Sequence, residues 1–277
     1  MGSYGPGTID PLTNKPIGTN FPVITINDMV NAQYNLLDYL KIEKLFAVAG
    51  GSMGGMQVLQ FVSNFPNKAK VALPIACTAS HSAQNIAFNE LGRQAIMSDS
   101  NWKEGLYYEK STNPDKGLAV ARMAAHITYL SKQGLQEKFG RNLQERSDLK
   151  FGFDADFQIE SYLRYQGSVF VDRFDANSYL YITRAMDYFD LTKQFNGNLS
   201  KAFEKTNSKF FVISFTSDWL YPTSENRDIV IALNSISKDV GFIEITSDKG
   251  HDSFLLDVPD FLSAVKNFLE TSYQKLK

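Results

Sequence analysis

The chain has 277 residues and a net charge of −2 at pH 7, and 43% of its residues are hydrophobic. This length and apolar content allow a full hydrophobic core in one large α/β domain. The near-neutral charge gives no reason to expect nucleic acid or an anionic membrane as a partner. The single cysteine, Cys77, excludes an internal disulfide, and no Cys/His spacing is typical of a metal site. Because we find no signal peptide and no apolar run long enough to span a bilayer, we expect a cytoplasmic protein without a bound metal or membrane anchor.

The first third of the sequence predicts a loop, a helix and two strands. Residues 1–21 are rich in Gly, Pro, Thr and Asn and are predicted to form a loop. Thr25 and Asp28 fit a capping box that opens a helix. Two short apolar runs, 44–49 and 70–75, have the composition of buried parallel strands.

The middle of the sequence has a different residue pattern. Helical periodicity dominates from about residue 85 to residue 196, aromatic side chains cluster, and no run resembles a buried strand. Segments 117–133 and 157–166 are predicted to be amphipathic helices. We therefore expect a helical lid over 85–196, inserted into an α/β core made of 1–84 and 197–277.

The pattern of strands and helices resumes after this lid. Strands are predicted over 209–215 and 240–246, and helices over 227–237 and 259–276. Strands that alternate with helices indicate a mostly parallel sheet flanked by helices.

Residues 50–54 carry the most informative motif. Gly50-x-Ser52-x-Gly54 lies between a predicted strand and a helix predicted over 53–64, which is the context of the nucleophile elbow in the α/β-hydrolase fold. The two glycines allow a sharp turn and a strained backbone at Ser52. The alternative is an ordinary glycine-rich turn between a strand and a helix.

A serine nucleophile needs a general base, and this fold places serine, acid and histidine in that chain order. His251 follows the last predicted strand and every candidate acid, so we predict that it is the base. Asp218 follows the preceding strand, where it would orient His251 and stabilise the imidazolium. Asp248 and Asp252 compete for this role, but both are too close to His251 in sequence to come from a separate strand end.

Four residues have simpler explanations. Asp218 could be a turn-forming aspartate, since Ser-Asp pairs favour turns. His81 and His126 do not occupy the position of the catalytic histidine in the motif, so we expect structural or surface imidazoles there. Cys77 is expected to be a small buried hydrophobic residue at a strand end.

Five segments together resemble the homoserine O-acyltransferases, and most of all the homoserine O-acetyltransferases of methionine biosynthesis. The segments are Gly50-Gly-Ser-Met-Gly-Gly-Met-Gln57, Asn89-Glu-Leu-Gly-Arg-Gln-Ala95, Gly117-Leu-Ala-Val-Ala-Arg-Met123, Ser161-Tyr-Leu-Arg-Tyr-Gln-Gly167 and Gly250-His-Asp-Ser-Phe254. The resemblance extends from about residue 2 to the C-terminal helix and covers the elbow, the lid and the triad.

This resemblance implies a ping-pong acyl transfer. Ser52 would attack acetyl-CoA, which is a co-substrate, so that no cofactor is required. L-homoserine, deprotonated by His251, would then accept the acetyl group. The backbone N–H of Met53 would donate to the oxyanion.

The family also implies how zwitterionic homoserine is recognised. Arg122 matches the residue that binds the carboxylate, and Tyr129 lies two helical turns further along the face that His126 shares. Asp252 matches the residue that receives the ammonium group. Alternatively, Arg122 is a solvated charge, because the lid offers other arginines: Arg93, Arg164, Arg173 and Arg184.

The sequence departs from the family at its start. Only 51 residues precede Ser52, whereas this fold places several strands ahead of the elbow, so we expect a shortened chain with poor solubility and weak activity. We expect a homodimer through the aromatic-rich lid helices of 157–189. The alternatives are succinyl transfer, a plain esterase, and an inactive fragment that retains only the dimer contacts.

Overall fold

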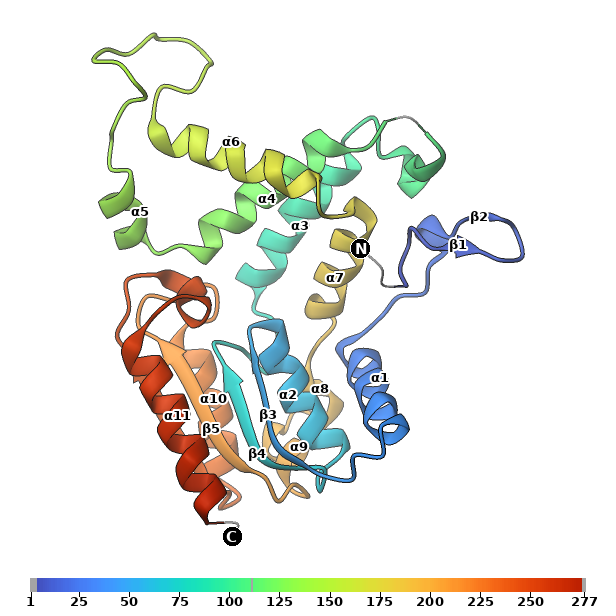
Figure 1. Ribbon diagram of the computed structural model, residues 1–277, viewed down its shortest axis with the longest axis vertical. Helices are drawn as coiled ribbons and strands as arrows, with labels where there is room; N and C mark the ends of the chain where they lie inside the picture. Colours follow the sequence, from blue (N-terminus) through green and yellow to red (C-terminus); the bar gives the residue numbers. More distant parts are fainter. Residues whose placement is uncertain (1–3, 111, 276–277) are drawn as a thin grey trace. The chain divides into compact units, whose positions relative to one another are not determined.

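The computed structural model describes residues 4–110 and 112–275, and its contacts divide the chain into two compact units (Figure 1). The helical unit comprises Met1–Ile24, Ala83–Thr128 and Lys132–Ala185. The sheet unit comprises Thr25–Ser82, Tyr129–Ser131 and Met186–Lys277. This division differs from the predicted lid and core, because it groups the N-terminal segment with the helices and groups 186–196 with the sheet.

A four-stranded parallel sheet forms the centre of the sheet unit, which confirms the predicted α/β fold. Its order is β3 (Leu45–Gly51), β4 (Ala69–Ile75), β5 (Lys209–Phe215) and β6 (Val240–Ile245). β4 and β5 are buried over most of their length, whereas β3 is half-buried and pairs with β4 alone among the described strands. All four strands therefore direct their carboxyl ends to the same edge of the sheet.

Helices cover both faces of this sheet because its strands are apolar on both faces. On β5, Phe210 and Val212 face one hydrophobic cluster, whereas Phe211 stacks on Phe268 of the other face with the ring centroids 4.4 Å apart. α11 covers this second face. The helices of the sheet unit are α1 (Ile26–Tyr39), α2 (Met53–Asn64), α8 (Leu191–Gln194), α9 (Leu199–Phe203), α10 (Thr223–Asn234) and α11 (Pro259–Gln274).

The helical unit has a core of its own. Ile96, Leu118 and Phe170 come from three different helices and are buried together in that core. Its helices are α3 (Ala83–Met97), α4 (Asp115–Tyr129), α5 (Lys132–Lys138), α6 (Gln158–Val171) and α7 (Ala176–Asp187). α4 and α7 each contribute their last residues to the sheet unit.

The prediction that 1–21 is only loop was wrong. Within the described part of this segment, β1 (Ile9–Asp10) and β2 (Lys15–Pro16) form a short antiparallel hairpin. The Tyr181 hydroxyl donates to the carbonyl oxygen of Phe21 at 2.5 Å. This long-range contact ties the segment to α7, and local sequence could not reveal it.

The helix predicted over 117–133 was too long. α4 ends at Tyr129 and α5 begins at Lys132. The carbonyl of Leu130 accepts a hydrogen bond from Trp219 Nε1 at 2.9 Å, which ties this break to the sheet unit. Helical periodicity continues across the break, so the sequence pattern missed it.

Other predicted elements match more closely. The helix over 53–64 and the strand over 209–215 have the predicted bounds, and the capping box of Thr25 and Asp28 opens α1. α10 begins four residues earlier than predicted, directly after Pro222, and ends three residues earlier. Residue 276, the predicted end of α11, lies outside the described residues.

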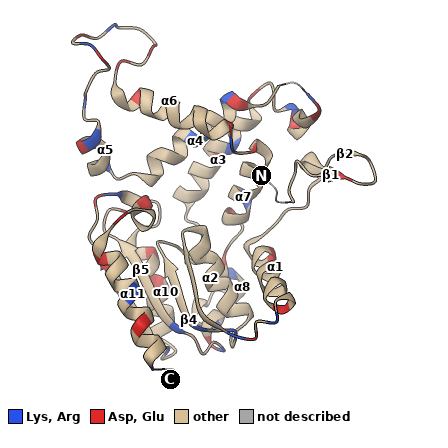
Figure 2. Ribbon diagram, in the orientation of Figure 1, with Lys and Arg blue, Asp and Glu red and all other residues tan. Residues whose placement is uncertain are grey.

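The surface of the chain carries charges of both signs. Figure 2 shows Lys and Arg interspersed with Asp and Glu on both units, in agreement with the small net charge. Among the described helices, none combines the length and the hydropathy needed to cross a bilayer.

We expect Gly55→Ala to destabilise the sheet unit, because a Cβ at this position would lie 2.5 Å from Cβ of Cys77. Such overpacking costs about 1–3 kcal/mol. Gly54→Ala is the matched control, since its Cβ would meet nothing within 4 Å and alanine favours a helix by about 1 kcal/mol over glycine. Urea unfolding measures both changes, and an equal effect of the two substitutions would contradict this account.

Candidate active site

The backbone at Ser52 adopts a conformation that few residues tolerate. Its φ is 58° and its ψ is −124°, and its N–H donates to the carbonyl of Ile75 at 3.0 Å. A Cβ at Gly50 would lie 2.4 Å from the carbonyl of Gly54, so only glycine permits the strand to approach the helix this closely. Strain of this kind typically costs about 1–3 kcal/mol and persists where the surrounding structure enforces it.

Ser52 is also the N-cap of α2, and its side chain makes no capping hydrogen bond. Its carbonyl accepts from the N–H groups of Gly55 and Met56 at 2.9 and 3.2 Å. Met53 is the first residue of the helix, where the N–H group has no acceptor within the helix. The positive end of the helix dipole therefore lies beside Ser52, in a position suited to an oxyanion.

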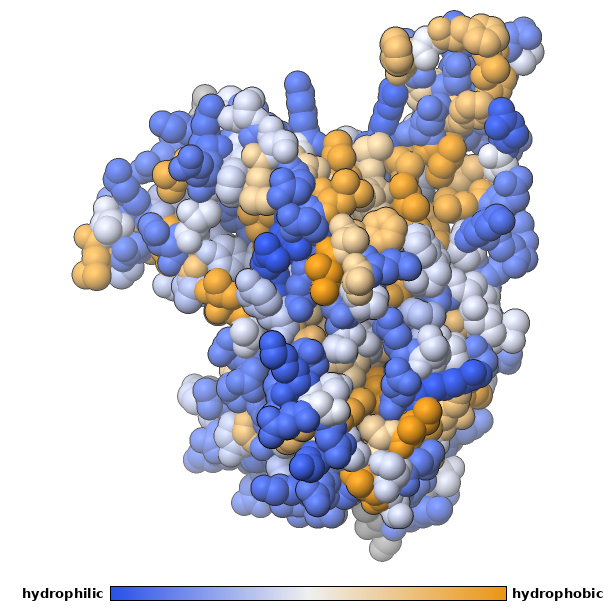
Figure 3. Space-filling model, turned by 180° about the vertical axis from the view of Figure 1, so that it is seen from behind, coloured by the Kyte–Doolittle hydropathy of each residue, from blue (hydrophilic) through white to orange (hydrophobic). Residues whose placement is uncertain are grey.

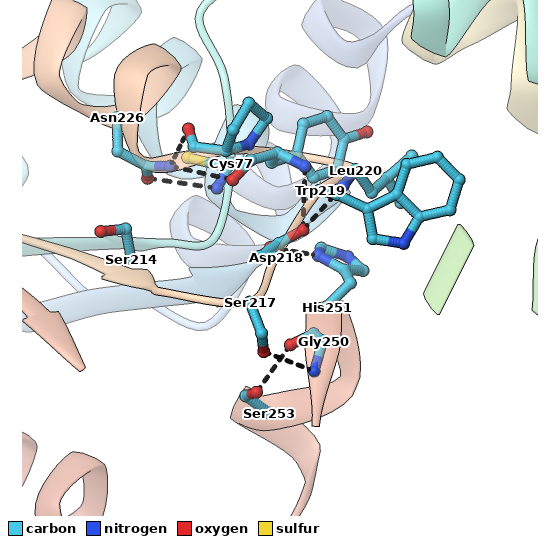
Figure 4. Close-up of polar contacts among 12 residues, drawn as sticks. Cys77, Ser214, Ser217, Asp218, Trp219, Leu220, Asn226, Gly250, His251 and Ser253 are labelled. Atoms are coloured by element: carbon cyan, nitrogen blue, oxygen red, sulfur yellow. Dashed lines mark hydrogen bonds and ion pairs between the residues drawn. The ribbon is translucent and has the colours of Figure 1, made fainter. Parts of the chain in front are cut away.

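Three successive residues after β5 bind the loop after β6. Thr216 binds Ser247. Ser217 binds Gly250 and Asp218 binds His251, as Figure 4 shows. Parallel neighbours end at the same edge, so the two loops meet there and a residue of one can orient a residue of the other.

The Asp218–His251 pair is buried, with side-chain exposures of 0% and 4%. His251 Nδ1 lies 2.8 Å from Asp218 Oδ2, while Oδ1 accepts the N–H groups of Leu220 and Tyr221 at 3.0 and 2.9 Å. Since a carboxylate only accepts, Nδ1 carries the proton and Nε2 remains as the basic nitrogen of a neutral imidazole. This is the tautomer that a general base requires.

His251 lies in a two-turn 3₁₀ helix, Gly250–Leu255, that packs against the elbow. The ring of Phe254 fills the space above Gly51, where a Cβ would lie 2.4 Å from it, and its centroid is 5.3 Å from that of His251. Gly250 has a φ of +68°, and a Cβ there would lie 2.6 Å from the carbonyl oxygen of Tyr129. These contacts place the histidine segment next to the residue that precedes Ser52.

The other predicted binding residues fall in different units. Within the sheet unit, the ring of Tyr129 lies 6.1 Å from that of His251, and Asp252 is half-buried beside His251. Arg122 lies in the helical unit, where its guanidinium group stacks 4.6 Å from the centre of the Phe170 ring.

Neither His81 nor His126 is a surface imidazole. His126 is buried in the helical unit with its ring 5.8 Å from that of Tyr162, and burial, reinforced by the Arg122 charge, lowers its pKa to about 4. The side chain of His81 is 2% exposed and binds Asp187 and Tyr221. No group of His, Cys, Asp and Glu suited to a metal ion occurs in the part of the chain that the structure describes.

Two residues near the Asp218–His251 pair were not singled out from the sequence. The ring of Tyr221 stands edge-on to His251 at a centroid distance of 5.2 Å. Burial, together with nearby Asp218, raises the pKa of Glu225 to about 7 although a hydrogen bond from Thr78 opposes the shift. Their positions three and seven residues after Asp218 are the only available signal, and short spacing alone does not establish proximity to a site.

Comparisons with known proteins agree with this geometry. The model of the α/β-hydrolase fold matches residues 4–258. The homoserine O-acetyltransferase of Pelagibacter ubique is 78% identical over 275 residues, which are 99% of this chain and 74% of that protein. The homoserine O-acetyltransferase of Mesorhizobium japonicum is 61% identical over 97% of this chain and 69% of that protein. The chain belongs to the homoserine O-acetyltransferase family.

Solved structures place this family member among transferases and esterases. The homoserine O-acetyltransferase from Bacillus anthracis superposes with a TM-score of 0.88 at 25% identity, covering 96% of this chain and 70% of that chain. Esterase E22 superposes with a TM-score of 0.86 at 29% identity, covering 96% and 72%. The fold is thus shared by enzymes that pass an acyl group to different acceptors.

Glu225→Gln tests the raised pKa of Glu225. Because the folded protein holds this proton up to about pH 7 and an unperturbed Glu releases it near 4.5, the free energy of unfolding falls as the pH rises through this interval. The uncharged variant lacks that loss. The free energy of unfolding of the variant relative to the parent should therefore rise by about 1 kcal/mol from pH 5 to pH 8, after allowance for the partial exposure of Glu225. Urea unfolding at both pH values measures the gain.

Glu90→Gln provides the control for this experiment. Hydrogen bonds from Gln94 and Arg93 lower the pKa of Glu90, so this carboxylate stays ionised at both pH values and its replacement should change stability equally at each. A pH-independent effect of Glu225→Gln would show that Glu225 titrates normally.

Proposed function

We propose that this chain transfers the acetyl group of acetyl-CoA to the hydroxyl of L-homoserine, a step of methionine biosynthesis. The observation that carries the proposal is the buried Asp218–His251 pair in the same unit as a strained Ser52, in a chain 78% identical to a homoserine O-acetyltransferase. The sequence alone left open a turn-forming role for Asp218 and an ordinary glycine-rich turn around Ser52. The close contact of Asp218 with His251 favours the catalytic role.

In the first half-reaction, Ser52 Oγ would attack the thioester carbonyl carbon while His251 Nε2 takes the serine proton. The developing oxyanion would be stabilised by the Met53 N–H. Collapse would break the C–S bond, and His251 would return the proton to the departing sulfur. The products are acetyl-Ser52 and free CoA.

In the second half-reaction, His251 would take the proton of the homoserine γ-hydroxyl as its oxygen attacks the acetyl-enzyme. The ester bond to Ser52 would break, and His251 would restore the proton to Ser52 Oγ. Asp218 would stabilise the imidazolium in both halves without itself taking the proton.

Recognition of homoserine requires one cation and one anion. We assign its carboxylate to Arg122, whose planar guanidinium group can donate two parallel hydrogen bonds. We assign its ammonium group to Asp252 and a packing role to Tyr129, whose ring lies near His251. Among these residues, Arg122 is the most direct test of specificity.

A second candidate function is ester hydrolysis. The similarity to esterase E22, at a TM-score of 0.86, specifically favours it, because the same serine chemistry releases a free acid when water reaches the acyl-enzyme. The two functions differ only in the acceptor that attacks acetyl-Ser52.

We further propose a cytoplasmic homodimer, since acetyl-CoA is an intracellular donor and the helical unit exposes apolar surface. Within the predicted interface of 157–189, Tyr165 and Val169 of α6 are 62% and 38% exposed. Phe151 and Phe153, just before this range, are 90% and 103% exposed and belong to the segment between α5 and α6, where Figure 3 shows hydrophobic colour gathered on a projecting loop. Surfaces of this kind favour a protein partner.

The decisive experiment measures thiol release from acetyl-CoA with and without L-homoserine, using Ser52→Ala as the blank. We expect release that requires both homoserine and Ser52, together with formation of O-acetylhomoserine. Ser52-dependent release that homoserine does not accelerate would indicate the esterase, and faster release from succinyl-CoA would indicate succinyl transfer. No release from a folded chain would contradict the proposed activity.

Arg122→Lys tests the assigned carboxylate contact. We expect the KM for homoserine to rise about 10-fold with a smaller change in kcat, because lysine cannot form the bidentate pair. Arg173→Lys is a matched control, since Arg173 stacks on the same Phe170 ring at 5.9 Å but is exposed. If both substitutions raise KM equally, Arg122 contributes packing alone.

A further inference from the structure

A second buried histidine–carboxylate pair lies within the sheet unit, apart from the triad. His81 Nδ1 is 3.0 Å from Asp187 Oδ1, and the two side chains are 2% and 4% exposed. His81 Nε2 is 2.7 Å from the hydroxyl of Tyr221. The three residues thus form a continuous chain of hydrogen bonds with no role in the steps described above.

The direction of these hydrogen bonds follows from simple chemistry. The Asp187 carboxylate only accepts, so His81 donates through Nδ1–H and presents Nε2 as an acceptor in its neutral form. Complete burial raises the pKa of Tyr221 well above its usual range, so the phenol keeps its proton and donates it to Nε2. Each group in the chain therefore finds a matching partner.

The contacts of the surrounding backbone hold this chain in place. The N–H of Leu191 donates to the carbonyl of Ala79 at 2.9 Å, and Ser80 forms a bridge with Asp190. A protein with buried polar groups such as these is often no more stable than one with apolar residues of the same size in their place. Stability alone therefore does not explain this chain of hydrogen bonds.

Tyr221 connects this chain to both members of the Asp218–His251 pair. Its backbone N–H donates to Asp218 Oδ1, and its ring packs edge-on against His251 with an interplanar angle of 63°. Asn226 Nδ2 also donates to the Tyr221 carbonyl oxygen, at 3.4 Å. Tyr221 is thereby held at its backbone and at its hydroxyl, with its ring between these points against the catalytic base.

We propose that Asp187, His81 and Tyr221 are positioning residues that hold the His251 imidazole against Asp218. His81 anchors the Tyr221 hydroxyl, Asp187 orients His81, and the fixed Tyr221 ring limits rotation of His251. This inference rests on the proposed function. It concerns the geometry of Asp218 and His251 beside Ser52, whether homoserine or water accepts the acetyl group.

Tyr221→Phe tests the proposal because it keeps the ring and removes only its anchor. We expect kcat for acetyl transfer to fall about 10-fold with little change in the KM for homoserine. A 1 Å displacement of a catalytic group can lower the rate about 100-fold, and loss of the anchor should displace His251 by less than that. A loosened imidazolium loses stabilisation from Asp218, so the acid limb of the kcat/KM profile should move to lower pH. The downfield NMR resonance of the His251 Nδ1 proton should shift or broaden.

His81 variants separate positioning from folding. The amide of Gln reaches the place of Nε2 and can accept from Tyr221, whereas the amide of Asn reaches only the place of Nδ1. We therefore expect His81→Gln to retain more of kcat and of the parental pH profile than His81→Asn. Equal loss of activity in both, in proportion to their loss of stability, would overturn the proposal.

Tyr107→Phe is the matched control for Tyr221→Phe. Tyr107 is 3% exposed, and its hydroxyl donates to Asp175 in the helical unit, so its loss should lower stability without moving the pH profile or the His251 resonance. If Tyr221→Phe behaves like this control, the chain of hydrogen bonds serves only packing.

Acylation of Ser52 by p-nitrophenyl acetate keeps this test distinct from the acceptor question. The burst reports the Ser52–His251 machinery without homoserine or CoA, so a parent chain that shows the burst but no transfer would refute the proposed function alone. An unchanged burst rate and unchanged NMR signal in Tyr221→Phe would refute the positioning role alone.

Discussion

The hydrogen bond between Asp218 and His251 is the constraint to which the rest of the sheet unit conforms. A fully buried carboxylate is costly unless its oxygens are hydrogen-bonded, and here one imidazole and two backbone N–H groups meet that need. The imidazole and the N–H groups come from loops that follow two neighbouring parallel strands, β6 and β5. Correct pairing of β5 with β6 therefore also brings Asp218 and His251 together.

The conformation of Ser52 depends on a different constraint, the close approach of β3 to α2. Gly50 permits this approach, and the carbonyl of Ile75 holds the N–H of Ser52 beyond the end of the paired strand. Phe254 then fills the space above Gly51 from the histidine segment. The strained conformation of Ser52 is thus enforced by its own helix, by the neighbouring strand and by the segment that carries His251.

Three ionisable groups near Asp218 have pKa values that burial raises. Tyr221 and Cys77 are buried near Asp218, and burial raises the pKa of each, so each keeps its proton. The half-buried Glu225 has a pKa raised to about 7, again chiefly by burial. Tyr221 and Cys77 therefore stand near Asp218 as neutral groups, and His251 is the partner that can take up positive charge beside it. A neutral surrounding of this kind strengthens the electrostatic interaction that the acyl transfer requires.

The sequence by itself determined the parallel α/β fold, the elbow at Ser52 and the chain order of Asp218 and His251, because these depend on local periodicity and short motifs. It also identified the family, since the motifs extend over almost the whole chain. Only the tertiary structure decided where α4 ends, because the contact of Leu130 with Trp219 joins residues 89 positions apart. The same holds for His81: its pairing with Asp187 and Tyr221 spans 106 and 140 positions, and no local pattern encodes partners so distant in sequence.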